Sequence, residues 1–600
     1  MPVAVPDSQW LWDNEPCRAA CPVHTDAGAY VTAIADRRFR DAYGIAREHN
    51  PFPSICGRVC AAPCETACRR GSLDTPISIR ALKRFVTERF GVESAFGAEL
   101  WHEAHGPVPP AEGPSVAVIG SGPGGLAAAC DLRLSGHRVT IYEAQPYLGG
   151  MYVHGVPEYR LDRQLIAAEI QAIVDLGLDI RLNCRVGTDI SFQSLVDEHD
   201  AVFVCIGASF GRELDIPGFN TPGVFKAVEF LWNMNLGDVA DVGGNVVVIG
   251  GGNVAFDAAR TAARAVAYHD GVTDPVTLES GFHATTRREM ANAMDAARAA
   301  IRAGAPSVTI IALESPDEMP AAADEIEEGV VEGVKLVFRR GPLRIVGNGK
   351  VEAIETVGVK SVFDEQRRFA PVFDTDDVQT FPTDAVIFAV GQQTDTSFIP
   401  DDLGIERNRG WIKVDQFMHT GHPKVWAGGD VAFGPRNLID AIGNGQRAAA
   451  SILATLAGNA PTPRSVKVKL IEKPEFRRVD TAYDDIARVH IPMIPGAARG
   501  GLALVETGYD EDAAVREGFR CLRCFENIML KPELCILCGL CVDVCPHDCI
   551  EIVHAEETGV GEPGKSALVL DEELCIRCGL CVERCPPHAL LMIHAEEVQR

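Results

Sequence analysis

The pattern of hydrophobic and polar positions changes along the chain, and each stretch predicts a different kind of structure. Residues 1–110 read as short helices with cysteines and prolines at the turns. From residue 115 to about 459, short apolar runs alternate with glycine turns and alanine-rich segments, which is typical of α/β units. A polar connector covers residues 460–530, and residues 531–600 carry one cysteine motif twice. The pattern predicts an α/β protein between two cysteine-rich ends.

Charge and length narrow the function classes. The chain has 600 residues and a formal net charge of −27. Such a charge argues against nucleic acid and anionic membranes as partners and fits contact with a basic patch on another protein. The first ten residues hold no basic stretch followed by an apolar run, so we expect no signal peptide and a cytoplasmic protein. Residues 115–134 are interrupted by glycines, so they predict a buried strand and helix rather than a membrane span.

Twenty cysteines lie almost entirely at the two ends of the chain. Six fall between Cys17 and Cys68, and eleven fall between Cys521 and Cys585. Without a secretion signal disulfides are not expected, and clustered thiols indicate metal binding. Three isolated cysteines are interpreted as core residues: Cys130, Cys184 and Cys205.

A glycine fingerprint of the dinucleotide-binding type lies in VAVIGSGPGG, residues 116–125. Its glycines would make a tight turn, let the backbone approach a pyrophosphate, and pack helix on strand. Glu143 ends the next strand at about the spacing expected for a ribose-binding acid. The alternative is a glycine-rich turn without a ligand. The candidate residues of this site are Gly120, Gly122, Pro123, Gly124, Gly125 and Glu143.

A second fingerprint follows in VVVIGGGNVA, residues 246–255. Two fingerprints in one chain predict that it binds two dinucleotides. The candidate residues of the second site are Gly250, Gly252, Asn253, Val254 and Ala255.

The C-terminal repeat CxxCxxCxxxCP has the spacing of a two-cluster ferredoxin. Three close thiolates would bind one cubane, and the fourth cysteine would reach the other. One [4Fe–4S] cluster is therefore assigned to Cys535, Cys538, Cys541 and Cys585. The second is assigned to Cys575, Cys578, Cys581 and Cys545. Structural zinc is the alternative, although it prefers paired CxxC motifs. Cys549 is left over and is interpreted as a bystander.

Seven motifs in order give the middle of the chain a family resemblance. They are NPFPSICGRVCAAPCETACRRG (50–71), GSGPGGLAAA, GGMYVHGVPEYRL (149–161), GGGNVAFDAARTA, DEMPA (317–321), AVGQQTD (389–395) and WAGGD (426–430). With these motifs most of residues 15–460 resemble the small subunit of glutamate synthase and its relatives. The relatives include the N-terminal part of dihydropyrimidine dehydrogenase and the large subunit of the bifurcating ferredoxin:NADP transhydrogenase.

The resemblance implies FAD in the first dinucleotide site and a nicotinamide nucleotide in the second. It also implies that Asp430 contacts the ribityl or phosphate region of the flavin and that the segment 441–446 caps the isoalloxazine side. The matched motifs add further cofactor-site residues: Gly149, Gly150, Gly391, Gly429, Ala441 and Ile442.

The expected fold class is α/β, with a helical iron–sulfur domain, two Rossmann-like domains and a C-terminal ferredoxin-like α+β domain. The expected limits are 1–110 for the helical domain, 115–235 and 375–459 for the FAD-binding domain, 236–374 for the NAD(P)H-binding domain, 460–530 for a connector with a CxxC motif, and 531–600 for the ferredoxin domain.

In this family the N-terminal region binds two [4Fe–4S] clusters, and its pattern starts with RCxxC. That phrase is absent before Cys17, but residues 513–524 resemble it closely. The hypothesis is that the phrase has moved behind the flavoprotein core and completes a cluster across the chain. The alternative is a CxxC without a ligand, or a zinc site. The proposed ligands are Cys17, Cys68, Cys521 and Cys524.

The other N-terminal cluster would use Cys21, Cys60 and Cys64. In relatives a Gln or Glu often supplies the fourth ligand, and Lys83 stands at that place here. A protonated lysine has no lone pair for iron, so Cys56 is the candidate fourth ligand. The alternatives are that Cys56 is a packed cysteine and that Glu65 or another oxygen donor binds the iron.

The strand that ends at residue 315 bears on nucleotide preference. Aligned on the EMPA phrase, Leu313 and Glu314 replace two arginines that relatives use for a 2′-phosphate. A carboxylate suits the ribose hydroxyls of NAD and repels a phosphate, and no cation in this segment compensates. We therefore expect NAD(H) rather than NADP(H), unless Arg287 and Arg288 fold back onto the site.

These expectations predict an electron-transfer flavoprotein that carries FAD and four [4Fe–4S] clusters and oxidises NADH. It would serve ferredoxin or a catalytic partner, such as a 2-oxoacid:ferredoxin oxidoreductase, within a hetero-oligomer. One alternative is the small subunit of glutamate synthase, which ordinarily lacks a two-cluster ferredoxin tail. Another is a non-catalytic electron-wiring scaffold, which two intact fingerprints disfavour. The extra segment 265–302 is interpreted as a docking hairpin.

Overall fold

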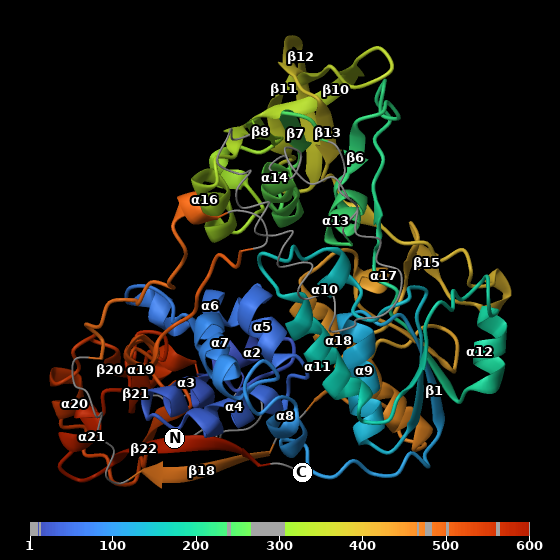
Figure 1. Cartoon of the computed structure of the whole chain (residues 1–600). Coiled ribbons are helices and arrows are strands. Elements are labelled where there is room, and N and C mark those ends of the chain that lie inside the picture. The colour runs from blue at the N-terminus through green and yellow to red at the C-terminus, as the bar shows by residue number, and fades with distance from the viewer. Residues whose placement is uncertain are drawn as a thin grey trace.

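The computed structural model describes residues 14–236, 242–265, 307–464, 467–473, 483–499, 503–559 and 564–598, together with Trp10 and Trp12 (Figure 1). Apart from its first residue, the segment 265–302, with Arg287 and Arg288, lies outside the described residues. In Figure 1 the helical N-terminal part lies between the C-terminal part and the first parallel sheet, and a second parallel sheet stands above them.

The N-terminal part is helical, as the sequence predicts. Proline in the first turn of three of its helices fixes φ at positions where the missing N–H would have no helical partner. Tyr30, Ile34, Leu82 and Phe85 are buried in its core. The helices are α2 (Pro16–Ala19), α3 (Ala27–Ala35), α4 (Phe39–Glu48), α5 (Pro53–Val59), α6 (Pro63–Thr66), α7 (Ile79–Phe90) and α8 (Glu99–Glu103), with a 3-10 turn at Arg69–Ser72.

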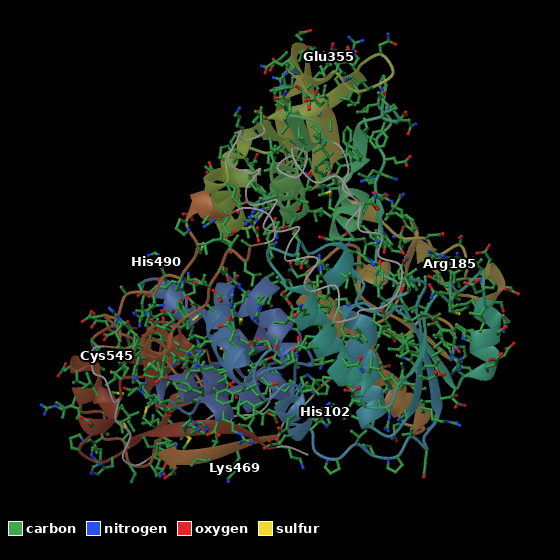
Figure 2. All side chains as sticks on the ribbon, in the orientation of Figure 1. His102, Arg185, Glu355, Lys469, His490 and Cys545 are labelled. Atoms are coloured by element: carbon green, nitrogen blue, oxygen red, sulfur yellow. The ribbon has the colours of Figure 1, made fainter. Side chains whose placement is uncertain are left out.

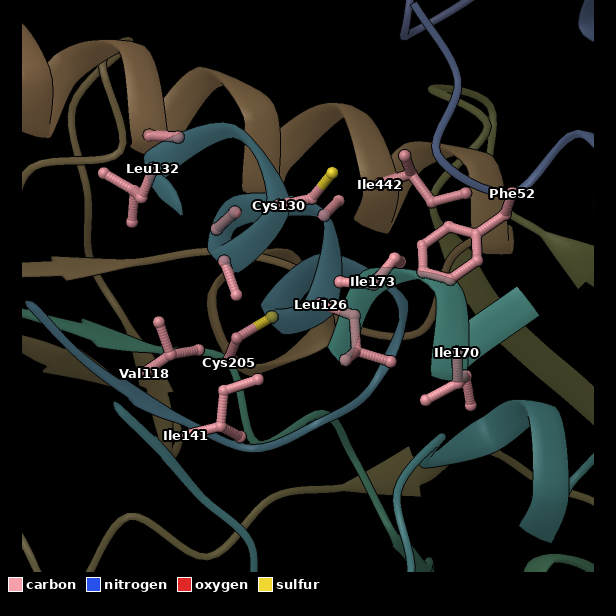
Figure 3. Close-up of a cluster of buried hydrophobic side chains, with 14 of the residues drawn as sticks. Phe52, Val118, Leu126, Cys130, Leu132, Ile141, Ile170, Ile173, Cys205 and Ile442 are labelled. Carbon is pink, nitrogen blue, oxygen red and sulfur yellow. The ribbon is translucent and has the colours of Figure 1, made fainter. Parts of the chain in front are cut away.

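The first sheet is parallel, with the order β17-β4-β1-β2-β3. Its central strand β1 (Ser115–Ile119) is apolar and buried, as a strand covered on both faces must be. Cys130 and Cys205 lie in its core, as expected (Figure 3), whereas Cys184 is only partly buried. The other strands are β2 (Arg138–Tyr142), β3 (Asp179–Arg181), β4 (Ala201–Val204) and β17 (Val425–Ala427). Its helices are α9 (Pro123–Leu134), α10 (Met151–His154), α11 (Arg163–Val174), α12 (Phe192–Glu198), α17 (Asp430–Phe433) and α18 (Leu438–Leu456).

The second sheet is also parallel, with the order β6-β13-β7-β8-β9. Its strands are β6 (Val224–Lys226), β7 (Asn245–Ile249), β8 (Ser307–Ile311), β9 (Lys335–Val337) and β13 (Ala385–Phe388). Its helices are α13 (Ala227–Asn235), α14 (Asn253–Ala265) and α16 (Ala323–Val331). Between β9 and β13 the chain forms a separate antiparallel sheet. Its strands are β10 (Arg340–Val346), β11 (Ala353–Phe363) and β12 (Phe369–Pro382). Short pairs are β5 (Phe210–Gly211) with β14 (Gln392–Gln393) and β15 (Arg407–Asn408) with β16 (Trp411–Ile412).

The second sheet reaches beyond the limits expected for its domain. Strands β6 and β13 lie in ranges assigned to the FAD-binding domain, yet β13 pairs with both β6 and β7. These strands have three and four residues, so they contain no periodicity that names a neighbour. The nicotinamide-type domain therefore takes in residues 224–235 and 385–388.

The connector is also more structured than a linker. Its strands β18 (Lys467–Lys473) and β19 (Glu526–Leu530) pair with the last strand β22 (Leu590–Val598) on either side. Its helix α19 (Glu511–Phe519) packs on α3. The two cysteine repeats then form α20 (Leu540–Asp543) and α21 (Leu580–Glu583), with a hairpin of β20 (Ile550–His554) and β21 (Ser566–Leu570) between them.

Two buried carboxylates join these parts at helix starts. Glu169 on α11 accepts hydrogen bonds from the backbone N–H groups of Ser54 and Ile55, in the first turn of α5, at 2.8 and 2.9 Å. Glu517 on α19 accepts them from Ser78, directly before α7, at 2.9 Å and from Val489 at 2.8 Å. Helix starts carry N–H groups without helical partners, so carboxylates from elsewhere in the chain stabilise them. Along the described residues, no helix combines the length and apolar character needed to cross a bilayer.

Candidate functional site

The first glycine fingerprint forms an open cradle at the carboxyl end of β1. Gly120 has a φ of +99°, and a Cβ on it would lie 2.5 Å from the carbonyl oxygen of Cys205. A Cβ on Gly125 would clash with the Gly120 carbonyl oxygen, so α9 packs tightly on the strand. Gly122 in contrast faces open space, with no atom within 4 Å of a Cβ position. An open glycine at the start of a helix, of which Pro123 is the first residue, fits an approaching pyrophosphate.

Glu143 is fixed beside this cradle. Its carboxylate accepts hydrogen bonds from the backbone N–H and hydroxyl of Ser121 at 2.9 and 2.6 Å, and from the backbone N–H of Gln145 at 2.9 Å. A Cβ on Gly150 would lie 2.8 Å from the Cα of Gly122, so the predicted glycine pair at 149–150 closes the other side of the cradle. The acid and both glycine segments therefore meet at one place.

The segment around Asp430 lies at the same end of the sheet. Gly429 has a φ of +69°, and its N–H donates to the side chain of Asn444 at 3.1 Å. Burial raises the pKa of Asp430 to about 6, although its carboxylate accepts the N–H of Arg436 at 3.2 Å. A Cβ on Gly124 would lie 2.7 Å from the carbonyl oxygen of Ala441, so the starts of α9 and α18 touch. Ile442 beside it points into the apolar core (Figure 3).

The second fingerprint repeats this geometry. Gly250 has a φ of +141°, and a Cβ on it would clash with the carbonyl oxygen of Ala389. Gly252 faces open space, and Ala255 is buried where its helix meets the strand. The side chain of Asn253 accepts the N–H of Ala322 at 2.9 Å, which joins this cradle to the start of α16. Val254 packs partly buried against the same core.

Glu314 also reaches the second cradle. A Cβ on Gly251 would lie 2.8 Å from its carboxylate, which therefore faces the fingerprint. The expectation covered cations of this segment only, and the fold adds one from outside it. The backbone N–H of Arg339 donates to the Glu314 carbonyl at 3.1 Å, and its half-exposed guanidinium pairs with Glu318 at 2.8 Å. Pairing of β8 with β9 brings Arg339 to this strand end, which the sequence segment alone could not show.

A cavity of about 1000 Å³ joins the second cradle and the Asp430 segment of the first sheet domain to the helical part. Asn253 and Gly391 line it from the second sheet domain, and Asp430 lines it from the first. Cys60 lines it from the helical part. The connector lines it too, through Arg488, Met493 and Glu506, a contribution that the sequence interpretation missed. His490, labelled in Figure 2, marks the place where the connector runs beside the helical part.

Four cysteines from both ends of the chain, proposed above as ligands of one cluster, line one small cavity. Its volume is about 30 Å³, and the thiols that line it are Cys17, Cys68, Cys521 and Cys524. Burial raises the pKa of Cys17 well above its usual range, and the neighbouring Cys524 raises it further. The structure thus brings together cysteines separated by more than 450 residues of sequence.

Buried ion pairs hold this arrangement in place. Arg520, next to Cys521, donates to Glu517 at 2.7 Å and to Asp74 at 2.9 Å. Arg70 donates to the carbonyl oxygens of Tyr483 and Arg520 at 2.8 and 3.2 Å. Both guanidinium groups are fully buried, so the contacts that satisfy them fix the α19 end against the N-terminal helices.

The other N-terminal thiols also lie together. Cys60 is hydrogen-bonded to Cys56, which lowers the pKa of Cys60 to about 7. Burial raises the pKa of Cys64, and Cys60 and Cys21 are the thiols that raise it further. Glu65 is already engaged, because it accepts the N–H of Arg80 at 2.8 Å and the guanidinium of Arg488 at 3.1 Å. Of the two proposed fourth ligands, the geometry favours Cys56.

Lys83 lies among these thiols as a buried cation. It is 8% exposed, and its ammonium lies 5.6 Å from the centre of the Tyr30 ring. Its charge lowers the pKa of Cys60, second to the Cys56 hydrogen bond, and also acts on Cys64. Among the described residues no carboxylate forms an ion pair with it. A desolvated ammonium needs an anion, and an iron–sulfur cluster bound by these thiolates would supply that charge.

The ferredoxin repeats form two thiol-lined cavities with the crossed arrangement that their spacing predicts. One, of about 20 Å³, is lined by Cys535, Cys538, Cys541 and Cys585. The other, of about 10 Å³, is lined by Cys545, Cys575, Cys578 and Cys581. Cys549 lines the second cavity as well, with its Sγ 3.2 Å from that of Cys545 (labelled in Figure 2), so it touches the site instead of standing apart. No three metal-ligating side chains in the described part converge tightly enough for a single ion.

The four thiol groups neighbour one another in a definite order. Cys60 lines the large cavity, and Cys64 of the same group lies near Cys17. Cys524 and Cys578 pack against one apolar cluster of Tyr483, Leu522 and Ile576. The order therefore runs from the cavity, through the two N-terminal groups, to the ferredoxin group that contains Cys578.

Two cradles for dinucleotides on parallel sheets, flanked by thiol groups, define a flavin- and pyridine-nucleotide-dependent oxidoreductase. Residues 114–449 match the family described as pyridine nucleotide-disulphide oxidoreductase, and the chain belongs to that family. Residues 12–94 match dihydropyrimidine dehydrogenase domain II with its 4Fe-4S cluster, and residues 534–589 match a 4Fe-4S dicluster domain.

The relatives are electron-transfer subunits. The chain is 35% identical over 546 residues to the NADP(+)-dependent formate dehydrogenase subunit beta of Moorella thermoacetica, covering 86% of this chain and 71% of the relative. It is 33% identical to the NADPH-Fe(3+) oxidoreductase subunit beta of Geobacter sulfurreducens, covering 86% and 75%. It is 30% identical to the NAD-dependent dihydropyrimidine dehydrogenase subunit PreT of Escherichia coli O157:H7, covering 75% and 92%. The chain is thus an electron-transfer flavoprotein with iron–sulfur domains.

Proposed function

We propose that this chain oxidises NADH in the cytoplasm and delivers the electrons, one at a time, to a catalytic partner in a hetero-oligomer. The observation that carries the proposal is a cavity that the second cradle shares with Asp430 of the first sheet domain and with Cys60 of the helical part. FAD bound in the first cradle would exchange a hydride with the nicotinamide and single electrons with the clusters. The protein's own residues orient these groups and keep them within one enclosed space.

Ion pairs between the domains support this proposal. Arg160 of the first sheet domain pairs with Asp257 and Glu325 of the second at 2.8 and 2.5 Å. Arg80 of the helical part pairs with Glu506 of the connector at 2.5 Å. Pairs between partly buried groups limit how far the two cradles and the thiols can separate. The cavity wall is therefore built from three domains and the connector.

We further propose four [4Fe–4S] clusters, one at each thiol group. Three of the groups offer four thiols that line a small cavity, which suits a cubane bound by four cysteines, and the thiols of Cys21, Cys56, Cys60 and Cys64 lie near one another. The order of the groups gives a path from the flavin to the ferredoxin domain. About sixteen iron atoms and one FAD per chain, measured after anaerobic purification, are the expected content. About eight iron atoms with a full complement of flavin would overturn the N-terminal half of this assignment.

The choice of NADH rests on Glu314. Its carboxylate faces Gly251, where it can accept hydrogen bonds from ribose hydroxyls but would repel a 2′-phosphate. Arg339 is the competing group, and its charge is shared with Glu318. Relatives carry names with NADP(+), NADPH and NAD, so they do not decide the matter.

Anaerobic stopped-flow bleaching of the flavin tests the proposal. NADH is expected to reduce the flavin with a higher kcat/KM than NADPH, and Glu314→Arg should narrow or reverse the gap. Arg339→Ala is the matched variant: it should leave the use of NADH unchanged. Faster reduction by NADPH, lost in Arg339→Ala, would overturn the nucleotide assignment. No bleaching by either nucleotide would instead indicate a wiring scaffold.

The partner is proposed by class. A low-potential oxidoreductase, of which a 2-oxoacid:ferredoxin oxidoreductase or a formate dehydrogenase is an example, fits a chain that ends in a ferredoxin domain. Isolation of the native complex and identification of its other subunits is the direct test. Formation of glutamate from glutamine and 2-oxoglutarate by that complex would identify the chain as a glutamate synthase subunit instead.

A further inference from the structure

The two C-terminal cysteine repeats have matching backbones. Leu537 and Arg577 each stand two residues after the first cysteine, and their φ angles are +53° and +55°. Gly539 and Gly579 follow with φ of +77° and +80° and precede one-turn helices. Because the backbones agree, a difference in side-chain exposure reports what covers each repeat.

The protein itself covers the second repeat. Ile576 is 4% exposed and packs against Tyr483 and Leu522. The Tyr483 hydroxyl donates to the carbonyl of Ile576 at 2.6 Å. The covering surface therefore consists of an aromatic and an aliphatic side chain beside Cys524, a member of the next thiol group.

The first repeat has no such cover within the described part of the chain. Ile536, the counterpart of Ile576, is 66% exposed, and its neighbour Leu537 is 47% exposed. Cys538 is exposed as well. Ile552 on β20 is 36% exposed and lines the same thiol cavity. Large aliphatic side chains gathered around a thiol group at the surface mark an interaction site.

The segment that carries this face has acidic side chains, and Lys531, directly before it, is paired with Glu472 at 3.0 Å. Residues 532–553 contain four carboxylates and no lysine or arginine. A partner that covers this face must therefore present basic groups around an apolar centre, because like charges across an interface are unfavourable. The cover of the second repeat shows that an apolar surface next to a redox group fits such a face.

We propose that Ile536, Leu537 and Ile552 around Cys538, here called the exit face, form the docking surface for a one-electron redox protein. The redox centre of this partner protein lies under an apolar patch that is bordered by lysine or arginine. The proposal rests on the proposed function and names the site where electrons leave. Cys535, Cys538, Cys541 and Cys585 would hold a cluster that, when reduced, supplies one electron to the partner's oxidised centre, with no bond or proton transferred.

The test uses the full-length protein reduced with dithionite and mixed with ferric cytochrome c, a basic protein with an exposed haem edge. Ile536→Lys places a cation in the centre of the exit face and should lower the second-order rate constant at least tenfold. Phe369→Lys on β12 is the matched control, because Phe369 is 65% exposed at the opposite end of the molecule (Figure 1), and its rate constant should change less than twofold. The rate constant of the unmodified protein should fall with ionic strength.

Iron content and the EPR spectrum of the reduced variants must match those of the unmodified protein. If Ile536→Lys loses iron, Ile552→Lys, outside the CxxC motif, is the deciding variant. An unchanged rate constant in the exit-face variant that retains its iron would contradict the proposed docking site. An equally large decrease in Phe369→Lys would contradict it as well. Failure of NADH to bleach the flavin would contradict the proposed function but leave this assay valid, since dithionite supplies the electrons.

Discussion

The two iron–sulfur regions of this chain are built in opposite ways. All eight proposed ligands of the ferredoxin pair lie between Cys535 and Cys585, and their spacing alone brings them together. The cavity of Cys17 and Cys524 needs both ends of the chain, joined through α19, α3 and a network of buried arginines. A site made by local spacing forms wherever its loop folds, whereas a site made by packing depends on every contact that holds the packing.

This difference predicts unequal sensitivity to change. The ferredoxin pair should tolerate alterations elsewhere in the protein, because all of its proposed ligands come from one local segment. The cross-chain group should fail when its anchors fail, because closing a loop of more than 450 residues has an entropic cost that packing must offset.

Removal of the displaced CxxC should have the largest effect. Replacing Cys521 and Cys524 together with serine should remove about four of about sixteen iron atoms and leave the EPR signals of the ferredoxin pair intact. Cys184→Ser is the control, since Cys184 lies in the first sheet domain and belongs to no thiol group. Unchanged iron content in the double variant would show that no cross-chain cluster exists.

Replacement of the proposed fourth ligand of the neighbouring cluster should have the next largest effect. Cys56→Ser should remove or severely weaken the cluster of Cys21, Cys60 and Cys64, seen as a loss of up to about four iron atoms per chain. Cys130→Ser, which changes another buried thiol, should retain all of the iron. Full retention of the cluster in Cys56→Ser would point to an oxygen donor.

Weakening an anchor tests the dependence on packing directly. Glu517→Ala removes two acceptors of backbone N–H groups and one partner of the buried Arg520. We expect the free energy of unfolding of this part to fall by about 3 kcal/mol, because a buried charge loses its partner. Differential scanning calorimetry with iron analysis should show a lower Tm and partial loss of the cross-chain cluster. The exposed Glu365→Ala should change neither; equal behaviour of the two variants would contradict the packing argument.

The smallest effect concerns Lys83. Lys83→Met keeps the aliphatic stem but removes a buried cation beside the thiols of Cys60 and Cys64. A nearby positive charge favours the reduced, more negative state of a cluster. Removal of this charge should therefore lower the midpoint potential of the cluster by about 59 mV, which is a tenfold change in the one-electron equilibrium. EPR-monitored redox titration measures this shift. The exposed Lys360→Met is the control, and a potential that does not move would place the charge of Lys83 outside the reach of the cluster.

Part of the site could be predicted from short stretches of sequence. The fingerprint glycines at 120 and 250 have positive φ, which the turn requires and which glycine adopts without strain. The crossed ligand sets of the repeats follow from residue spacing. The displaced RCxxC phrase was recognisable because its neighbours moved with it, although its assignment to a cluster stays a prediction.

Other features could not be read from the sequence. Arg339 reaches Glu314 only because β8 pairs with β9, and strands β6 and β13 join the second sheet through pairing that three or four residues do not encode. The connector gave a polar pattern typical of a linker, yet Arg488 and Glu506 line the large cavity. The spacing of the ferredoxin repeat assigns no ligand role to Cys549, and only the fold places its sulfur beside that of Cys545.

The sequence by itself determined the chemistry of each site, because ligand type, glycine turns and motif spacing are properties of a few neighbouring residues. The tertiary structure decided which sites meet: that Cys17 and Cys524 line one cavity, that Cys60 lines a cavity together with the second cradle and Asp430, and that Ile576 is covered while Ile536 is not. The physical reason is that these relations depend on packing between segments far apart in the chain. Such packing is set by the burial of whole helix and sheet faces, and no short stretch of sequence contains it.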